Sequence, residues 1–280
     1  GDHTVEVQKK CFELGISDFI AKPFNNAIIK QRVKNTAEFF DYKLKLEDKV
    51  AEQTNVLRKA YRTLQIQAEH LKKKNQQIIE MLGTVVEYRS TESGEHIQRV
   101  KGYTRILAEA VMEDYPEYEL TKEKIDIIES VSALHDIGKI AIPDRILLKP
   151  GRLTSEEFEY MKSHTIRGCE LLDSIKEDWN DDTMKYAYEI CRHHHERYDG
   201  KGYPDGLVGD EIPICAQLVS VADVYDALVN ERCYKDAFSK EDAYRMIITG
   251  ECGVFSPKLM ESFRKVRPAF EKLANKSFRK

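Results

Sequence analysis

Histidine and aspartate side chains that could bind metal ions are concentrated in the last two thirds of this 280-residue chain. The dipeptide His135-Asp136 follows an apolar, helix-like run and offers an imidazole beside a carboxylate. Both groups bind divalent ions, and a carboxylate has two oxygens, so Asp136 could bridge two ions while His135 ligates one of them. Alone this pair is weak evidence, because such dipeptides occur by chance.

Four further segments carry ligands of the same kind. Glu92 and His96 are four residues apart, so on a helix they share one face. The others are His164, the histidine run 193–195 and Asp223. Each has a simpler interpretation, such as a surface histidine or an ion-paired carboxylate. Six of the eight histidines fall in this region, however, and together these segments predict a metal centre. Histidine and carboxylate ligands suit iron and manganese equally well.

Composition limits the kinds of protein that could position this centre. Hydrophobic residues make up 41% and charged residues 33%, which is typical of a soluble, helix-rich protein. A formal charge of −4 argues against a nucleic-acid polymer as partner, so local groups would have to hold any phosphate. The six cysteines are scattered, which indicates reduced thiols in the cytoplasm. No apolar run approaches the roughly 20 residues that span a bilayer, so no membrane association is expected.

Residues 39–86 predict one long helix, because they contain no proline and a single glycine. Apolar residues recur every seven positions, which is typical of a coiled coil. The main seam consists of Val50, Leu57, Leu64, Leu71, Ile78 and Val85, and the weaker one of Thr54, Tyr61, Ala68, Asn75 and Leu82. A single asparagine in the weaker seam favours a parallel homodimer. The alternative is a helix that packs against its own domain.

Residues 87–280 are helix-patterned again and interrupted by loops at 142–153 and 198–213, so the expected fold class is an all-α helical bundle. Thr154 to Glu157 has the sequence of a capping box, as does Ser239 to Asp242. The chain therefore divides into an N-terminal segment 1–38, a linker helix 39–86 and a bundle 87–280.

The N-terminal segment has a helix, strand, loop, helix order, with the short strand expected at 18–21. Its run CFELGISDFIAKPF resembles the end of a response-regulator receiver domain, in which the lysine before the proline, here Lys22, lies beside a phosphorylated aspartate. The strands that would carry that aspartate are not in this sequence. The segment is therefore interpreted as a partial receiver, short of strands, with a small helical cap as the alternative.

Residues 87–275 resemble an HD-GYP domain, a branch of the HD-superfamily metal-dependent phosphohydrolases that hydrolyse cyclic di-GMP. The resemblance rests on HDIGKIAIPDRILLKPGRLT, HTIRG, HHERYDGKGYPDGL and ADVYDAL followed by ERCYK. It implies a metal shell of His135, Asp136, His164, His194, His195 and Asp223, with Asp136 as the bridge and His193 as an extra histidine. Glu92 and His96 match the pair that supplies a third metal in some members, which implies two or three divalent ions, iron or manganese.

The resemblance also implies how substrate is held. Lys139 matches a lysine that contacts substrate phosphate, although its position also suits a helix C-terminal charge. Arg232 and Lys235 match residues that hold the second phosphate or guanine, and their alternative is simple solvation. The loop at Gly202-Tyr203-Pro204 implies substrate access or docking of a protein partner. The expected reaction is hydrolysis of cyclic di-GMP to pGpG or GMP. The alternatives are a non-catalytic cyclic dinucleotide receptor and a phosphohydrolase acting on another cyclic dinucleotide.

Overall fold

The computed structural model describes residues 5–16, 19–20, 22–23, 25–90, 94–176, 179–230 and 237–276. The chain forms two compact units, residues 1–71 and 72–280. The division falls inside the predicted linker helix. In the structure this helix is longer than predicted and spans Asn26–Arg89 as α2. In the described ranges no helix has the length and apolar character needed to cross a bilayer.

The described elements follow in chain order: α1 (Val5–Glu13), α2 (Asn26–Arg89), α3 (Gly94–Asp114), η1 (Pro116–Tyr118), α4 (Lys122–Val131), η2 (Ser132–Leu134), η3 (Ile137–Ala141), α5 (Asp144–Leu147), α6 (Ser155–Lys162), α7 (His164–Asp173), α8 (Asp181–His193), η5 (Gly209–Glu211), α9 (Ile214–Val229), α10 (Lys240–Ile248) and α11 (Pro257–Ala274). The described residues contain no β-strand, only an isolated bridge between Asp199 and Val208. The all-α prediction is therefore confirmed.

The first unit consists of α1 and most of α2. The expected strand at 18–21 falls partly outside the described residues, and the described Phe19 and Ile20 have no regular structure. Arg32 of α2 donates to the Phe19 carbonyl at 3.2 Å. The predicted seam along α2 is exposed in the single chain, with Leu57 71% and Leu64 63% accessible to solvent.

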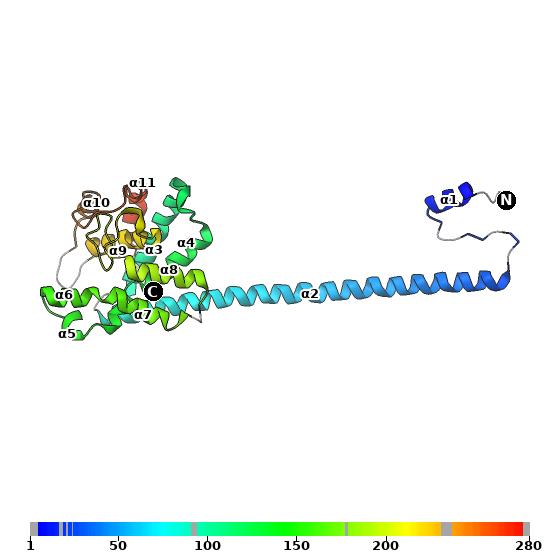
Figure 1. The fold of residues 1–280 in the computed structure, drawn as a ribbon, viewed down its shortest axis with the longest axis horizontal. Helices are drawn as coiled ribbons and strands as arrows, with labels where there is room; N and C mark the ends of the chain where they lie inside the picture. The colour runs from blue at the N-terminus through cyan, green and yellow to red at the C-terminus, as the bar shows by residue number, and fades with distance from the viewer. Residues whose placement is uncertain are drawn as a thin grey trace. The chain divides into compact units, whose positions relative to one another are not determined.

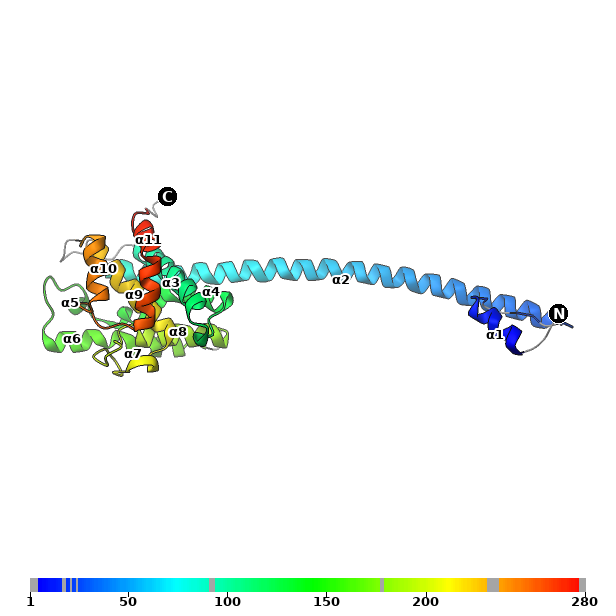
Figure 2. The same cartoon turned by 90° about the horizontal axis from the view of Figure 1, so that it is seen from above.

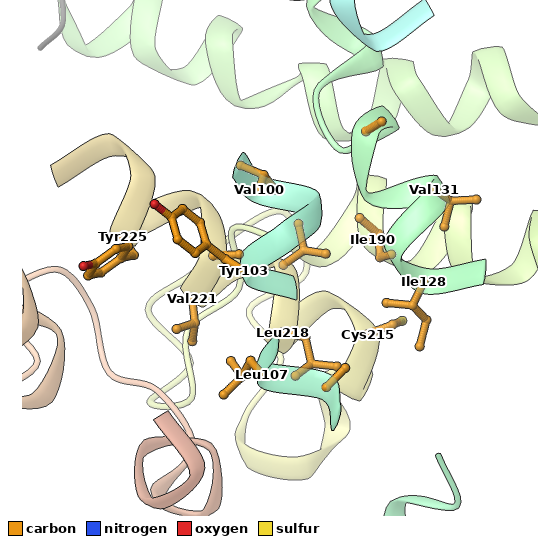
Figure 3. Packing of buried hydrophobic residues seen from close by; sticks show 14 of the residues in the cluster. Val100, Tyr103, Leu107, Ile128, Val131, Ile190, Cys215, Leu218, Val221 and Tyr225 are labelled. Atoms are coloured by element: carbon orange, nitrogen blue, oxygen red, sulfur yellow. The ribbon is translucent and has the colours of Figure 1, made fainter. Parts of the chain in front are cut away.

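The second unit is a helical bundle built around α3. α9 and α11 pack on α3, and both views place them beside it (Figure 1 and Figure 2). α8 packs against α4, α7 and α9. Figure 3 shows how α3 contributes Val100, Tyr103 and Leu107 to the interior, where they meet Leu218 and Val221 of α9. These side chains are fully buried, which fixes α3 and α9 as a rigid pair.

Aromatic rings close one end of this core. Tyr103 stacks on Phe270 of α11 with ring centroids 4.7 Å apart and meets Tyr225 of α9 edge to face at 5.1 Å. The helix that starts at Ser155 has the predicted capping box between Thr154 and Glu157. Ser239 caps α10 by accepting from the Asp242 amide, as its sequence also predicts. The capping box predicted at Thr154 is therefore confirmed, whereas at Ser239 the structure shows the N-cap hydrogen bond alone.

Candidate metal centre

The His135-Asp136 dipeptide lies between two short 3-10 helices. α4 ends at Val131, η2 follows directly, and Asp136 breaks the helical path with φ −104° and ψ 14° before η3 begins. The chain therefore does not continue as one α-helix from α4 through Lys139. Lys139 and Asp136 are nevertheless adjacent, with Nζ 2.6 Å from Oδ2, because a 3-10 helix also places residues three apart on one side.

Three segments, the ends of η2 and α8 and the start of α7, direct histidines toward Asp136. Its Oδ1 lies 3.1 Å from His164 Nε2 and 3.7 Å from His194 Nε2, and its Oδ2 lies 3.2 Å from His135 Nε2. His195 completes a group in which one ligand atom from each of Asp136, His164, His194 and His195 lies within 4.8 Å of the others. The sequence-predicted ligands at 135, 136, 164, 194 and 195 therefore come together around one carboxylate.

The orientation of the rings tests whether these residues fit a metal ion. The Nδ1 atoms face backbone carbonyl oxygens, at 2.9 Å for His135 and Ser132, 2.7 Å for His164 and Met161, and 3.0 Å for His194 and Ile190. A ring that donates from Nδ1 keeps its lone pair on Nε2. Among the described residues, these three buried Nε2 atoms and Asp136 Oδ1 have no hydrogen-bond partner. Electron-rich atoms directed at one another need positive charge between them, which a proton supplies in the metal-free protein and a divalent ion would supply when bound, so the residues fit a divalent ion.

Burial and neighbouring charges set the protonation of these groups. Burial disfavours a charged imidazole, but the neighbouring carboxylates, Asp136 first, outweigh it and raise the pKa of His135 to about 10. Burial lowers the pKa of both His194 and His195. Burial also favours the neutral form of Asp136, but Lys139 and His135 hold the pKa of that carboxyl well below its ordinary value. The metal-free centre therefore combines an anionic Asp136 carboxylate and a protonated His135 with neutral imidazoles at His194 and His195. A bound metal would have to displace the His135 proton, because only neutral imidazole ligates metal.

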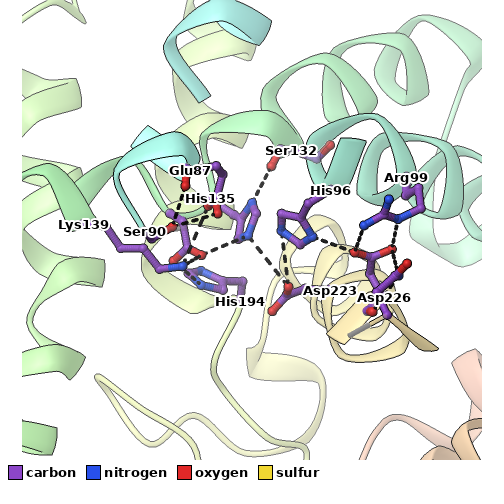
Figure 4. Close-up of polar contacts among 12 residues, drawn as sticks. Glu87, Ser90, His96, Arg99, Ser132, His135, Lys139, His194, Asp223 and Asp226 are labelled. Atoms are coloured by element: carbon purple, nitrogen blue, oxygen red, sulfur yellow. Dashed lines mark hydrogen bonds and ion pairs between the residues drawn. The ribbon is translucent and has the colours of Figure 1, made fainter. Parts of the chain in front are cut away.

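His96 and Asp223 extend the centre toward α3 and α9. Asp223 Oδ1 lies 3.7 Å from His96 Nε2 and 4.0 Å from His135 Nε2 (Figure 4). The other ring nitrogen of His96 lies 2.8 Å from Asp226, which also accepts two hydrogen bonds from Arg99, at 2.6 and 3.0 Å. Asp226 and Arg99 therefore orient His96 from behind.

Sequence reasoning missed Arg99 and Asp226. Each lies three residues after a predicted ligand on the same helix, His96 and Asp223 respectively, and this spacing is the signal that could have identified them. The pair is buried, with Arg99 6% and Asp226 2% exposed.

Glu87 was also missed. It lies in the last turn of α2, is 1% exposed, and forms with His96 and His135 a second group whose ligand atoms lie within 4.8 Å of one another. Lys139 Nζ lies 3.8 Å from Glu87 Oε1 as well as beside Asp136. No pattern in the sequence identifies Glu87, because only the approach of α2 to η3 brings it to the centre.

Gly138 allows the backbone of η3 to lie directly on α7. A Cβ atom at Gly138 would lie 1.8 Å from the His164 carbonyl oxygen and 2.5 Å from the Gly168 nitrogen. This close approach brings Asp136 and His164, on two separate segments, within 3.1 Å of each other.

The loop that contains Gly202-Tyr203-Pro204 folds over the centre. The Tyr203 ring lies against His195 with centroids 4.7 Å apart. The buried carboxylate of Glu196 accepts hydrogen bonds from the backbone amides of Asp205, Gly206 and Leu207. Tyr203 therefore contacts a predicted ligand, while docking of a protein partner at this loop stays a prediction. Three other predicted site residues, Glu92, Arg232 and Lys235, lie outside the described residues.

Comparison with known proteins identifies the family to which this chain is similar. A family model described as "HD domain" matches residues 60–252. The chain is 36% identical over 270 residues to a "Probable cyclic di-GMP phosphodiesterase" of Vibrio cholerae, an alignment that covers 94% of this chain and 59% of that protein. It is also 36% identical over 264 residues to a "Cyclic di-GMP phosphodiesterase" of Thermotoga maritima, covering 93% of this chain and 68% of that protein.

A solved structure supports the fold independently. The crystal structure of a cyclic GMP-AMP specific phosphodiesterase of V. cholerae superposes with a TM-score of 0.51 at 16% identity, covering 72% of this chain and 51% of that one. At this identity the likeness concerns the fold alone. The metal-ligand arrangement, the family match over more than half of the sequence and the Thermotoga relative together show that this chain belongs to the HD domain family.

Proposed function

We propose that this protein is a metal-dependent phosphodiesterase that hydrolyses cyclic di-GMP. The observation that supports the proposal is the cluster of buried histidine Nε2 atoms around Asp136, which have no hydrogen-bond partner among the described residues. The relatives named as cyclic di-GMP phosphodiesterases support the choice of substrate.

The chain's own residues suit a two- or three-metal site of iron or manganese. We assign one ion to Asp136, His164, His194 and His195, and another to Glu87, His96 and His135, with Asp223 between the two groups. Divalent ions in these positions would polarise a phosphodiester and activate water near neutral pH. Glu92 remains the proposed ligand for a third ion.

Lys139 is the proposed phosphate-binding group. Its ammonium lies 2.6 Å from Asp136, at the edge of the metal-ligand cluster, and its side chain is 15% exposed. A cation in this place can stabilise negative charge that builds up on the phosphoryl oxygens. Arg232 and Lys235 are proposed to hold the second phosphate or a guanine.

Two substitutions separate metal binding from phosphate binding. Asp136→Ala is expected to lose both metal and turnover, because it removes the carboxylate on which three histidines converge. Lys139→Ala is expected to keep its metal and lose most of the rate. Metal content by elemental analysis and turnover of cyclic di-GMP check both. A metal-free Lys139→Ala protein, or a fully loaded Asp136→Ala protein, would contradict these assignments.

We also propose that the protein is a homodimer joined through residues 39–86. The seam residues Val50, Leu57, Leu64 and Leu71 are all more than half exposed in the single chain. A row of exposed leucines at heptad spacing is suited to pairing with a second copy of the same helix.

Residues 1–38 are proposed to be the end of a receiver domain. The alignments to the Vibrio and Thermotoga relatives cover 94% and 93% of this chain, well beyond the HD domain match at 60–252. Alignments of this coverage extend into residues 1–38, so at least part of this segment is shared with the two relatives.

A further inference from the structure

The last turns of α2 contact the chain on both sides of the His135-Asp136 dipeptide. Before the dipeptide, Gly83 lies so close to η2 that a Cβ atom there would be 2.3 Å from the Ala133 carbonyl oxygen. After it, Arg89 reaches the segment that follows Lys139. The helix therefore brackets the metal-binding dipeptide.

Arg89 makes an unusually complete set of contacts with that segment. Its guanidinium donates to the backbone carbonyls of Lys139 at 3.0 Å, Ile140 at 2.7 Å and Ile142 at 2.7 Å, and to the Asp144 carboxylate at 2.7 and 3.2 Å. The carbonyls at the end of a short helix lack donors within the helix, and a charged donor satisfies them strongly. One side chain thus fixes the path of the backbone over residues 139–142.

This path determines where the Lys139 side chain begins. Glu87, two residues before Arg89, lies 3.8 Å from the Lys139 ammonium, so α2 faces both the backbone and the charged end of the same lysine. A change in the position of α2 would consequently move Lys139 relative to Asp136.

We propose that Arg89 is a positioning residue that holds the 139–142 backbone so that Lys139 faces the metal centre, and that it thereby couples the α2 helix to the rate of the reaction. The inference rests on the proposed function, because it assigns Arg89 a role in phosphodiester hydrolysis. It makes α2 a regulatory element whose last turn acts on Lys139.

Arg89→Ala tests the proposal, with Arg105→Ala as a matched control. The Arg105 side chain is 34% exposed against 32% for Arg89, and it pairs with Glu129 and Asp126, away from residues 139–142. Hydrogen exchange should accelerate at residues 137–142 in Arg89→Ala and stay at the wild-type rate in Arg105→Ala. Unchanged exchange in Arg89→Ala would overturn the proposed clamp.

Kinetics test the route through Lys139. Arg89→Ala is expected to lower kcat by about tenfold to 100-fold with KM nearly unchanged, because a displacement near 1 Å is enough for such a loss. Arg89→Lys can reach fewer carbonyls, so its kcat should lie between those of the wild type and Arg89→Ala. In a Lys139→Ala background, adding Arg89→Ala should lower kcat by less than about twofold further, because Arg89 and Lys139 act as one unit.

The outcomes distinguish this inference from the proposed function. An equal loss from Arg89→Ala with and without Lys139 would refute positioning through that lysine. If the metal-loaded wild type hydrolyses no cyclic dinucleotide, the proposed function fails, and hydrogen exchange at 137–142 alone then decides whether Arg89 fixes this backbone.

Discussion

Gly138→Ala should separate metal binding from folding. The new Cβ atom would meet only backbone, at 1.8 Å from the His164 oxygen, 2.5 Å from the Gly168 nitrogen and 2.8 Å from the His164 carbonyl carbon. No side-chain rotation relieves such contacts. Ordinary van der Waals contacts begin at 3.4 Å. Increasing the distance between the new Cβ atom and the His164 oxygen from 1.8 Å to 3.4 Å takes a displacement of about 1.6 Å between η3 and α7.

That displacement acts directly on the centre, because η3 follows Asp136 and α7 begins at His164. The two ligand atoms are 3.1 Å apart, and metal–ligand distances tolerate deviations of only about 0.2 Å. Overpacking of this kind costs about 1–3 kcal/mol of folding stability, which a bundle of this size can withstand. We therefore expect a folded protein with most of its metal lost.

Elemental analysis after gel filtration and thermal unfolding with and without added Mn²⁺ measure the two effects. Gly102→Ala is the matched control, because its Cβ would meet the end of the flexible Leu273 side chain at 2.5 Å, away from the metal ligands. The control should keep its full metal content. A Gly138→Ala protein with wild-type metal content and activity would refute the argument from close packing.

Three further predictions concern charge and assembly. Asp226→Asn removes the buried carboxylate that pairs with Arg99 at 2.6 Å and leaves this buried cation with Glu95, 3.5 Å away. The substitution should lower the free energy of unfolding by about 3–5 kcal/mol in urea titrations, and a loss below about 1 kcal/mol would contradict the buried pair. The metal-free protein should carry a proton on His135 at pH 8, because the pKa of His135 is raised to about 10. Mn²⁺ binding should therefore release about one proton, which calorimetry in buffers of different ionisation enthalpy measures. Binding without proton release would contradict the protonated His135. Because folding raises the pKa of His135 from 6.5 to about 10, its proton stabilises the metal-free fold fully below pH 6.5. This stabilisation is lost as the pH rises toward 10. Leu64→Glu should be a monomer by light scattering, because it places a charge in the seam. The control Thr63→Glu lies off the seam and should remain a dimer. If both variants are dimers, the dimer contact does not lie along this seam.

The sequence predicted a group of candidate metal ligands because their residue types are rare and fall in separated motifs of one region. His135, Asp136, His164, His194 and His195 converge in the structure as expected. The long helix was equally readable, since a heptad pattern needs no tertiary information. Its length was underestimated, because residues 26–38 continue the helix without the heptad signal.

The rest depended on how segments far apart in sequence approach one another. Nothing in the local pattern shows that Glu87 and Arg89 of α2 reach Lys139, because these contacts span about 50 residues. The 3-10 path through η3 was missed for the same reason. It follows from the packing of Gly138 on α7, which a helical pattern in the sequence does not reveal.

The proposed activity is tested by hydrolysis of cyclic di-GMP with protein that is purified without oxygen and loaded with iron or manganese. The products are separated by chromatography. We expect pGpG or GMP from the wild type and neither from Asp136→Ala. Cyclic GMP-AMP as a parallel substrate tests the choice of base. A metal-loaded protein that binds cyclic di-GMP and leaves it intact would contradict the proposed phosphodiesterase activity and identify a receptor instead.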